Sequence, residues 1–181
     1  MIQGTDIALL TRWQSFYMIM GTGAATLMGL TFLAITLAAG IETHLSTLDA
    51  GISAYNTPTV AHFAAVLVIA GILSAPWQTF ASVGLLLSLF GFGMVIYLVL
   101  VMRRMRRIPG YQVSRKDWLW YMALPLSAYI ILFIFAATLA ANPALALYLI
   151  AAAMGVLLFL GIHNAWDLVI FFAVERSHIE K

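Results

Sequence analysis

The sequence predicts an all-α integral membrane protein with five transmembrane helices, on the basis of its composition and its pattern of apolar runs. Of its 181 residues, 64% are hydrophobic and 9% are charged, and the mean hydropathy is +1.01. Soluble globular domains are about 45 to 50% apolar and about 25% charged. A water-soluble fold would leave too much apolar surface exposed, so soluble classes are excluded. The absence of cysteine also excludes disulfide scaffolds, thiol redox catalysis and thiolate metal sites.

Five apolar runs have the length that a membrane span requires. A bilayer core of about 30 Å needs about 20 residues of helix. We therefore predict one transmembrane domain over residues 1–181, with spans at 14–40, 58–75, 79–102, 118–141 and 143–174. The first run exceeds the roughly 7 to 15 apolar residues of a cleaved signal peptide, so we expect it to be a span.

Prolines mark three places in these runs. Pro58 and Pro143 each follow a capping side chain, Thr57 or Asn142, and proline suits the first position of a helix because its missing N–H would have no partner there. Pro125 lies inside the fourth span and leaves the carbonyl of Tyr121 without its usual donor, so we predict a kink. The connections before the third and fifth spans are short enough for tight antiparallel hairpins.

The segment between the first two spans, residues 41–57, is too polar to cross the membrane. Leu45, Leu48, Ile52 and Tyr55 recur at steps of three and four residues, which predicts a short helix lying along the inner interface. Gly51 weakens that helix, so an irregular loop stays open as the alternative.

Basic residues predict the orientation. Six of the nine Lys and Arg lie between the third and fourth spans: Arg103, Arg104, Arg106, Arg107, Arg115 and Lys116. Short cytoplasmic loops carry the excess of basic residues, so this loop is predicted to be inside, the N-terminus outside and the C-terminus inside. The protein is then expected in the inner, or plasma, membrane, and its compact loops suggest a bacterium.

The basic loop indicates anionic lipid as a candidate partner and argues against nucleic acid. Clusters of basic residues beside a span attract anionic lipids, so those six side chains are candidate lipid contacts, although they also serve as a topology anchor. A short loop held at an anionic membrane surface is not expected to bind nucleic acid.

Ionisable side chains inside the spans are the candidate functional residues. His163, Asn164 and Asp167 lie in the fifth span, where His163 and Asp167 share a helical face, and His62 lies in the second. Measured from the inner ends of these spans at 1.5 Å per residue, His62 lies about 6 Å deep, Asp167 about 12 Å and His163 about 18 Å. His62 is therefore expected closer in depth to Asp167 than to His163.

Intramembrane His and Asp are typical of proton and ion pathways, so our first hypothesis is a channel or transporter that uses His62, His163, Asn164 and Asp167. It needs no cofactor. The first alternative is a membrane-embedded enzyme or redox subunit, with a metal held by His62, His163 and Asp167 or a b-type haem between the two histidines. The second is a non-catalytic assembly or regulatory subunit, in which an Asp–His hydrogen-bond network only fixes helix register.

Small residues follow two spans at helical spacing. Gly21, Ala25 and Gly29 form a stripe on the first span, and the third span carries a similar set of Gly84, Ser88, Gly91 and Gly93. Such stripes let backbones approach closely, either within one chain or at the seam of a homo-oligomer. We expect a homo-oligomer in which either helix can line a central path.

Overall fold

The structure is a computed structural model, and it describes residues 2–39, 49–105 and 118–179. All elements in these three ranges are helical, which confirms the all-α prediction. They are α1 (Ile2–Ala39), α2 (Asp49–Ser74), α3 (Phe80–Met105), the π-helix η1 (Leu119–Ala123), α5 (Leu124–Ala137) and α6 (Pro143–Ile179).

Four stretches in the described ranges are long and apolar enough to cross a membrane. They are Ala8–Leu37, Phe80–Arg104, Leu119–Ala137 and Pro143–Asp167, and they match the predicted first, third, fourth and fifth spans. The predicted second span is a shorter apolar stretch, Thr59–Ser74, within α2.

The start of α2 corrects one predicted boundary. Pro58 is not the first helical residue, because α2 already begins at Asp49. Residues 49–57 are therefore helical, but as the first turns of α2 and not as a separate interfacial helix. Residues 41–48 of that predicted helix lie outside the described ranges. A proline within a helix removes the bond to the carbonyl four residues earlier, here that of Ala54, and the helix continues on both sides of it.

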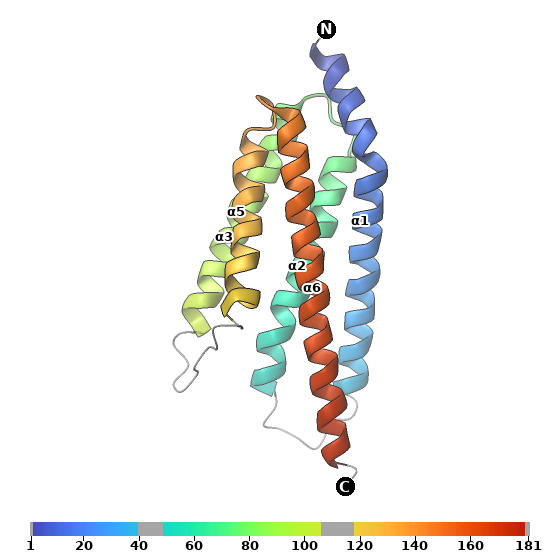
Figure 1. The fold of residues 1–181 in the computed structure, drawn as a ribbon, viewed down its shortest axis with the longest axis vertical. Helices are drawn as coiled ribbons and strands as arrows, with labels where there is room; N and C mark the ends of the chain where they lie inside the picture. Colours follow the sequence, from blue (N-terminus) through green and yellow to red (C-terminus); the bar gives the residue numbers. More distant parts are fainter. Residues whose placement is uncertain (1, 40–48, 106–117, 180–181) are drawn as a thin grey trace.

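Helix α6 is the central helix of the bundle. It packs against α1, α2 and α5, while α1 pairs with α2 and α3 pairs with α5 (Figure 1). Half of its most apolar 18-residue window is buried, compared with 17% for the corresponding window of α1. The two helix pairs therefore lie on either side of α6, and side chains on α6 can contact both.

Glycines explain how closely the pairs pack. A Cβ on Gly21 would lie 2.9 Å from Ala70, and a Cβ on Gly84 or Gly91 would meet the backbone of α5. These glycines of the two predicted stripes thus serve packing within the chain. Gly29 and Gly93 instead face open space.

The fourth span begins with a π turn where a kink was predicted. The N–H of Leu124 donates to the carbonyl of Leu119, five residues earlier. Pro125 follows at once and cannot donate to the Tyr121 carbonyl, so the wider turn accommodates the missing bond. At the other end of the span, Asn142 accepts from the N–H of Leu145 over 3.5 Å and caps α6, with Pro143 as its first residue.

Candidate functional site

A histidine and a tyrosine from two helices form a buried pair in the core. The Nδ1 atom of His62, on α2, lies 3.0 Å from the hydroxyl oxygen of Tyr129, on α5. Both side chains are 0% exposed. The remaining ring nitrogen of His62, Nε2, has no hydrogen-bond partner within the described ranges. The Nε2 atom of His62 can therefore bind one further hydrogen-bond donor or acceptor inside the core.

A close approach of α2 to α6 places His62 in the core. A Cβ on Gly161 would lie 2.5 Å from the ring of Phe63, so this ring packs directly on the α6 backbone. Asn164 lies one turn further along the same face of α6 and is 3% exposed. Neither its amide nitrogen nor its amide oxygen has a partner among the described residues. This part of the core thus holds hydrogen-bonding groups that water or a bound ion can satisfy.

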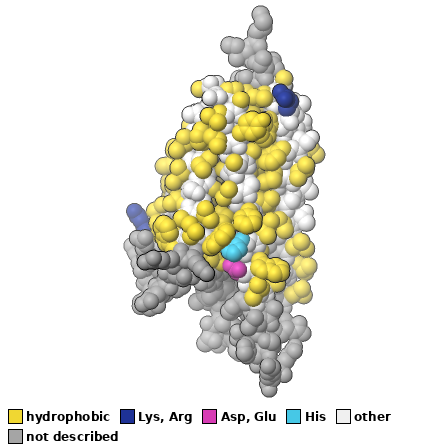
Figure 2. Space-filling view, in the orientation of Figure 1, with side chains coloured by type: hydrophobic (Ala, Val, Ile, Leu, Met, Phe, Trp, Pro, Cys, Tyr) yellow, Lys and Arg dark blue, Asp and Glu magenta, His cyan; other side chains and the backbone are white. Residues whose placement is uncertain are grey.

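A second cluster lies on the surface of the bundle. The Nε2 atom of His163 lies 3.6 Å from Oδ2 of Asp167, as their four-residue spacing predicts. The Tyr121 hydroxyl, from η1, donates to the same oxygen over 3.2 Å. The ring of Trp120 lies 4.1 Å from the His163 ring, centroid to centroid. The side chains of His163 and Asp167 are 32% and 46% exposed, and Figure 2 shows adjacent histidine and acidic side chains on an otherwise apolar face.

Contacts between helices change one predicted relation between these side chains. His62 was expected to lie closer in level to Asp167 than to His163. Phe63, the neighbour of His62, packs on Gly161, which is two residues from His163 and six from Asp167 on α6. The partners of His62 and Asp167, Tyr129 and Tyr121, are eight residues or about 12 Å apart along the helix. His62 therefore lies closer in level to His163, because the packing of α2 on α6, and not the distance from Pro58, sets its place.

The predicted site residues thus fall into two separate groups. His163 and Asp167 are brought together, and Asn164 lies beside them in the chain but faces the core. His62 is paired with Tyr129 instead. No three His, Asp or Glu side chains in the described part of the chain are grouped so that they could hold a metal ion, so the ligand set of His62, His163 and Asp167 is not assembled there.

The candidate lipid contacts are described only in part. Arg103 and Arg104 are exposed in the last turn of α3. The other four, Arg106, Arg107, Arg115 and Lys116, lie outside the described residues.

Sequence reasoning missed the tyrosines that complete both clusters. Tyr121 and Tyr129 are eight residues apart, on either side of Pro125. Tyr129 bonds the histidine of α2, and Tyr121 bonds the carboxylate of α6. Two hydroxyl-bearing aromatics within one apolar run were the available signal, because a buried tyrosine hydroxyl usually has a hydrogen-bond partner.

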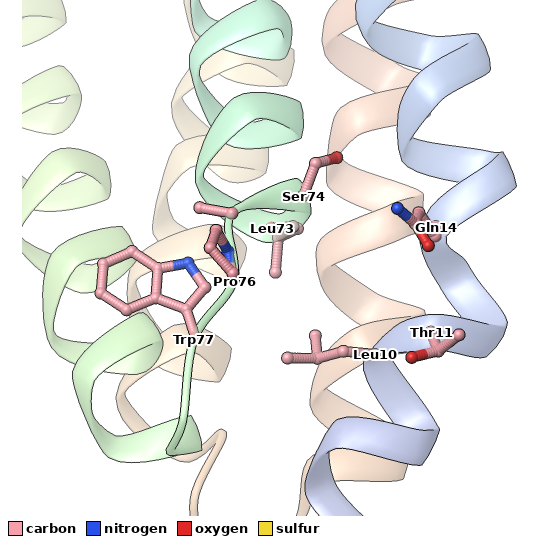
Figure 3. A pocket seen from close by; sticks show the side chains of 8 residues that line it. Leu10, Thr11, Gln14, Leu73, Ser74, Pro76 and Trp77 are labelled. Atoms are coloured by element: carbon pink, nitrogen blue, oxygen red, sulfur yellow. The ribbon is translucent and has the colours of Figure 1, made fainter.

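An open pocket of about 180 Å³ lies at the opposite end of the bundle, between α1 and the end of α2. Thr11, Gln14 and Ser74 give it polar walls, and the Gln14 side chain extends toward α2 (Figure 3). Tyr17, one turn below Gln14 on α1, is buried, and its hydroxyl has no partner among the described residues. Polar groups thus reach into the core from this end as well.

Comparisons with known protein families, curated proteins and solved structures find no match to this chain. The candidate function therefore follows from the geometry of these residues.

Proposed function

We propose that this chain forms a homo-oligomeric membrane transporter that moves protons or small ions by way of the buried His62–Tyr129 pair. The observation that carries the proposal is a fully buried histidine, halfway along its helix, with one ring nitrogen bonded and the other free for water or an ion. Titratable groups at that depth are costly and are typical of proton relays.

The contacts of His62 suit proton transfer. The Nδ1 atom of histidine and the tyrosine hydroxyl each serve as donor or acceptor, so the bond between His62 and Tyr129 can form with the proton on either side. Histidine serves as a proton shuttle because one ring nitrogen can take up a proton while the other releases one. The pair can therefore accept a proton on one side and release it on another.

The surface cluster supplies the route to the inner end. His163 and Asp167 remain accessible, and Asn164, the residue after His163, faces the core with its amide free of described partners. Protons would pass from Asp167 and His163 past Asn164 to His62. Water would bridge steps that exceed a hydrogen-bond length.

An apolar stretch separates His62 from the other end of the bundle. Val66, Ile69 and Leu73 of α2 are buried between His62 and the level of Tyr17, a length of about 18 Å. A continuous water pore does not fit such a core. We therefore favour a transporter that opens by helix movement over an open channel.

The orientation is part of the proposal, with the surface cluster facing the cytoplasm of a bacterial cell. A cysteine placed at Gly110 should resist an impermeant thiol reagent in intact cells, and one placed at Asn142 should react. Labelling at Gly110 from outside would overturn the proposed orientation.

The same apolar stretch supports a second candidate, the non-catalytic assembly or regulatory subunit. In that case the polar pairs fix helix register and no flux occurs. The metal or haem enzyme receives no comparable support, because no three candidate metal ligands come together in the described ranges and the two histidines face separate partners, His62 facing Tyr129 and His163 facing Asp167.

Flux in reconstituted liposomes tests the proposal. His62→Gln keeps a hydrogen-bonding side chain but cannot carry a proton at neutral pH, so flux per folded molecule should fall at least ten-fold. Tyr148→Phe, at an exposed tyrosine near the other end of α6, is the control and should keep full flux. Full flux in His62→Gln would refute the relay, and absence of flux in the unmodified protein would favour the assembly subunit.

A further inference from the structure

Three buried hydrogen-bonding atoms of α2 and α6 have no partner among the described residues. They are Nε2 of His62 and both amide atoms of Asn164, and the two side chains are 0% and 3% exposed. Ser88 on α3 is also buried, but its hydroxyl donates to the Leu85 carbonyl of its own helix. Unpaired polar groups are costly in a core, so the three atoms indicate a bound molecule or ion.

The packing of α2 on α6 brings His62 and Asn164 to nearly the same level. The two helices run in opposite directions (Figure 1), and the ring of Phe63 packs on Gly161. In the same direction along the bundle, His62 lies one residue from this contact and Asn164 lies three, or about 1.5 Å and 4.5 Å. Asn164 also lies on the face of α6 that carries Gly161. The two side chains are therefore about 3 Å apart in level, on helices that are in contact.

The bond to Tyr129 assigns the hydrogen on the His62 ring. The Tyr129 hydroxyl has no other acceptor among the described residues, so it donates to Nδ1. A neutral imidazole carries its hydrogen on the other nitrogen, which makes Nε2 a donor that lacks an acceptor. The Asn164 amide has both a donor and an acceptor to satisfy. Water suits this set, because it accepts from Nε2 and both donates to and accepts from an amide.

The same groups suit other ions poorly. Mg²⁺ and Ca²⁺ take at least about six oxygen ligands, and Na⁺ sites in transporters use the carbonyls of unwound helices. Here α2 and α6 are continuous, and the carboxylate of Asp167 lies at the surface with other partners. A buried anion needs a compensating charge, and no Lys or Arg of the described ranges is buried. A proton needs no such ligands, since a ring nitrogen binds it covalently.

We propose that His62 and Asn164 hold water in the core and that the proton is the ion this chain moves. The inference rests on the proposed function and narrows its substrate from small ions to protons. Uptake of a proton at one ring nitrogen and release from the other moves one proton across His62 and inverts its tautomer. The water supplies or takes the proton at Nε2. Asn164 is a positioning residue, because its amide holds this water against the ring.

Solid-state NMR of the ¹⁵N-histidine-labelled protein in liposomes tests the water site without using flux. Nε2 of His62 should carry the hydrogen and should receive magnetisation from water although the ring is 0% exposed. His62→Gln identifies its signal among the four histidines. Asn164→Leu, which has a similar size but no polar atoms, should remove the transfer from water. Ser88→Ala is the matched control at a buried polar position and should keep it.

Ion selectivity in liposomes separates the inference from the proposed function. Proton flux should persist when choline and gluconate replace sodium and chloride. It should fall at least ten-fold in Asn164→Leu, remain in large part in Asn164→Gln, which keeps the amide, and stay complete in Ser88→Ala. Flux carried by sodium or chloride would leave the transporter in place and overturn the inference. Nε2 without water contact in the unmodified protein, or unchanged water transfer in Asn164→Leu, would overturn it too. Absence of flux for every ion would refute the proposed function, while water contact at Nε2 would still support the site.

Discussion

The two histidines of the bundle have similar partners but very different surroundings. His62 is completely buried and bonds a tyrosine 67 residues away in the chain. His163 is one-third exposed and contacts a carboxylate four residues away on its own helix. The His163–Asp167 pair can form wherever α6 is helical, whereas the His62–Tyr129 pair exists only if three helices pack in one arrangement. The free energy of unfolding should therefore depend very little on the His163–Asp167 pair and strongly on the His62–Tyr129 pair.

The largest effect should come from forcing α2 away from α6. In Gly161→Val, new carbon atoms would occupy the place of the Phe63 ring, which lies 2.5 Å from an ideal Cβ. Overpacking of this kind costs about 3 kcal/mol, so the protein should melt well below the unmodified chain in detergent or nanodiscs. Tryptophan fluorescence, or the rate of hydrogen exchange at backbone amides near His62, should change in the same variant.

Gly71→Val is the matched control for this substitution. Gly71 lies on α2 and has nothing within 4 Å of an ideal Cβ, so stability should change by less than about 0.5 kcal/mol. Equal melting of the two variants would show that the contact between Phe63 and Gly161 does not hold α2 in place.

The fold was largely predictable because hydropathy and span length act locally. The four long apolar helices and the capped start of α6 at Asn142 follow from those signals. The start of α2 did not, because Pro58 suits a first helical position but does not prevent the helix from beginning earlier, at Asp49. The sequence pattern also did not predict which helices are neighbours. The glycines at the helix contacts were assigned to stripes, but a stripe does not identify the helix that packs against it.

A smaller effect is expected from removing one hydroxyl of the buried pair. Tyr129→Phe leaves Nδ1 of a fully buried histidine without its partner, which costs about 2 kcal/mol of unfolding free energy. Tyr121→Phe removes the same atom from the surface cluster and should cost less than about 0.5 kcal/mol. Chemical denaturation of both variants measures the difference. Equal losses of unfolding free energy in the two variants would mean that burial does not make the His62–Tyr129 bond more important for stability than the Tyr121–Asp167 bond.

The candidate site was predictable only where it is local. The four-residue spacing of His163 and Asp167 places them on one helical face in any fold. Their exposure, the pairing of His62 with Tyr129, and the order of depths depend on how α2 and α5 pack on α6. A single sequence carries those facts only through weak signals, such as two tyrosines in an apolar run.

The smallest stability effect, with a large effect on flux, should come from Asp167→Asn. The side chain is 46% exposed, and an ion pair four residues apart at such a position contributes about 0.5 kcal/mol or less. Asparagine keeps an oxygen for the Tyr121 hydroxyl but cannot take up a proton. Melting should therefore stay within a degree or two of the unmodified protein, while proton flux per folded molecule falls at least ten-fold if Asp167 is a relay group. Asp167→Leu extends the comparison, because it also removes the acceptor for Tyr121 and His163, but both contacts are partly exposed and the further loss of stability should be small. Full flux in Asp167→Asn would leave the surface pair with a structural role and confine proton transfer to His62.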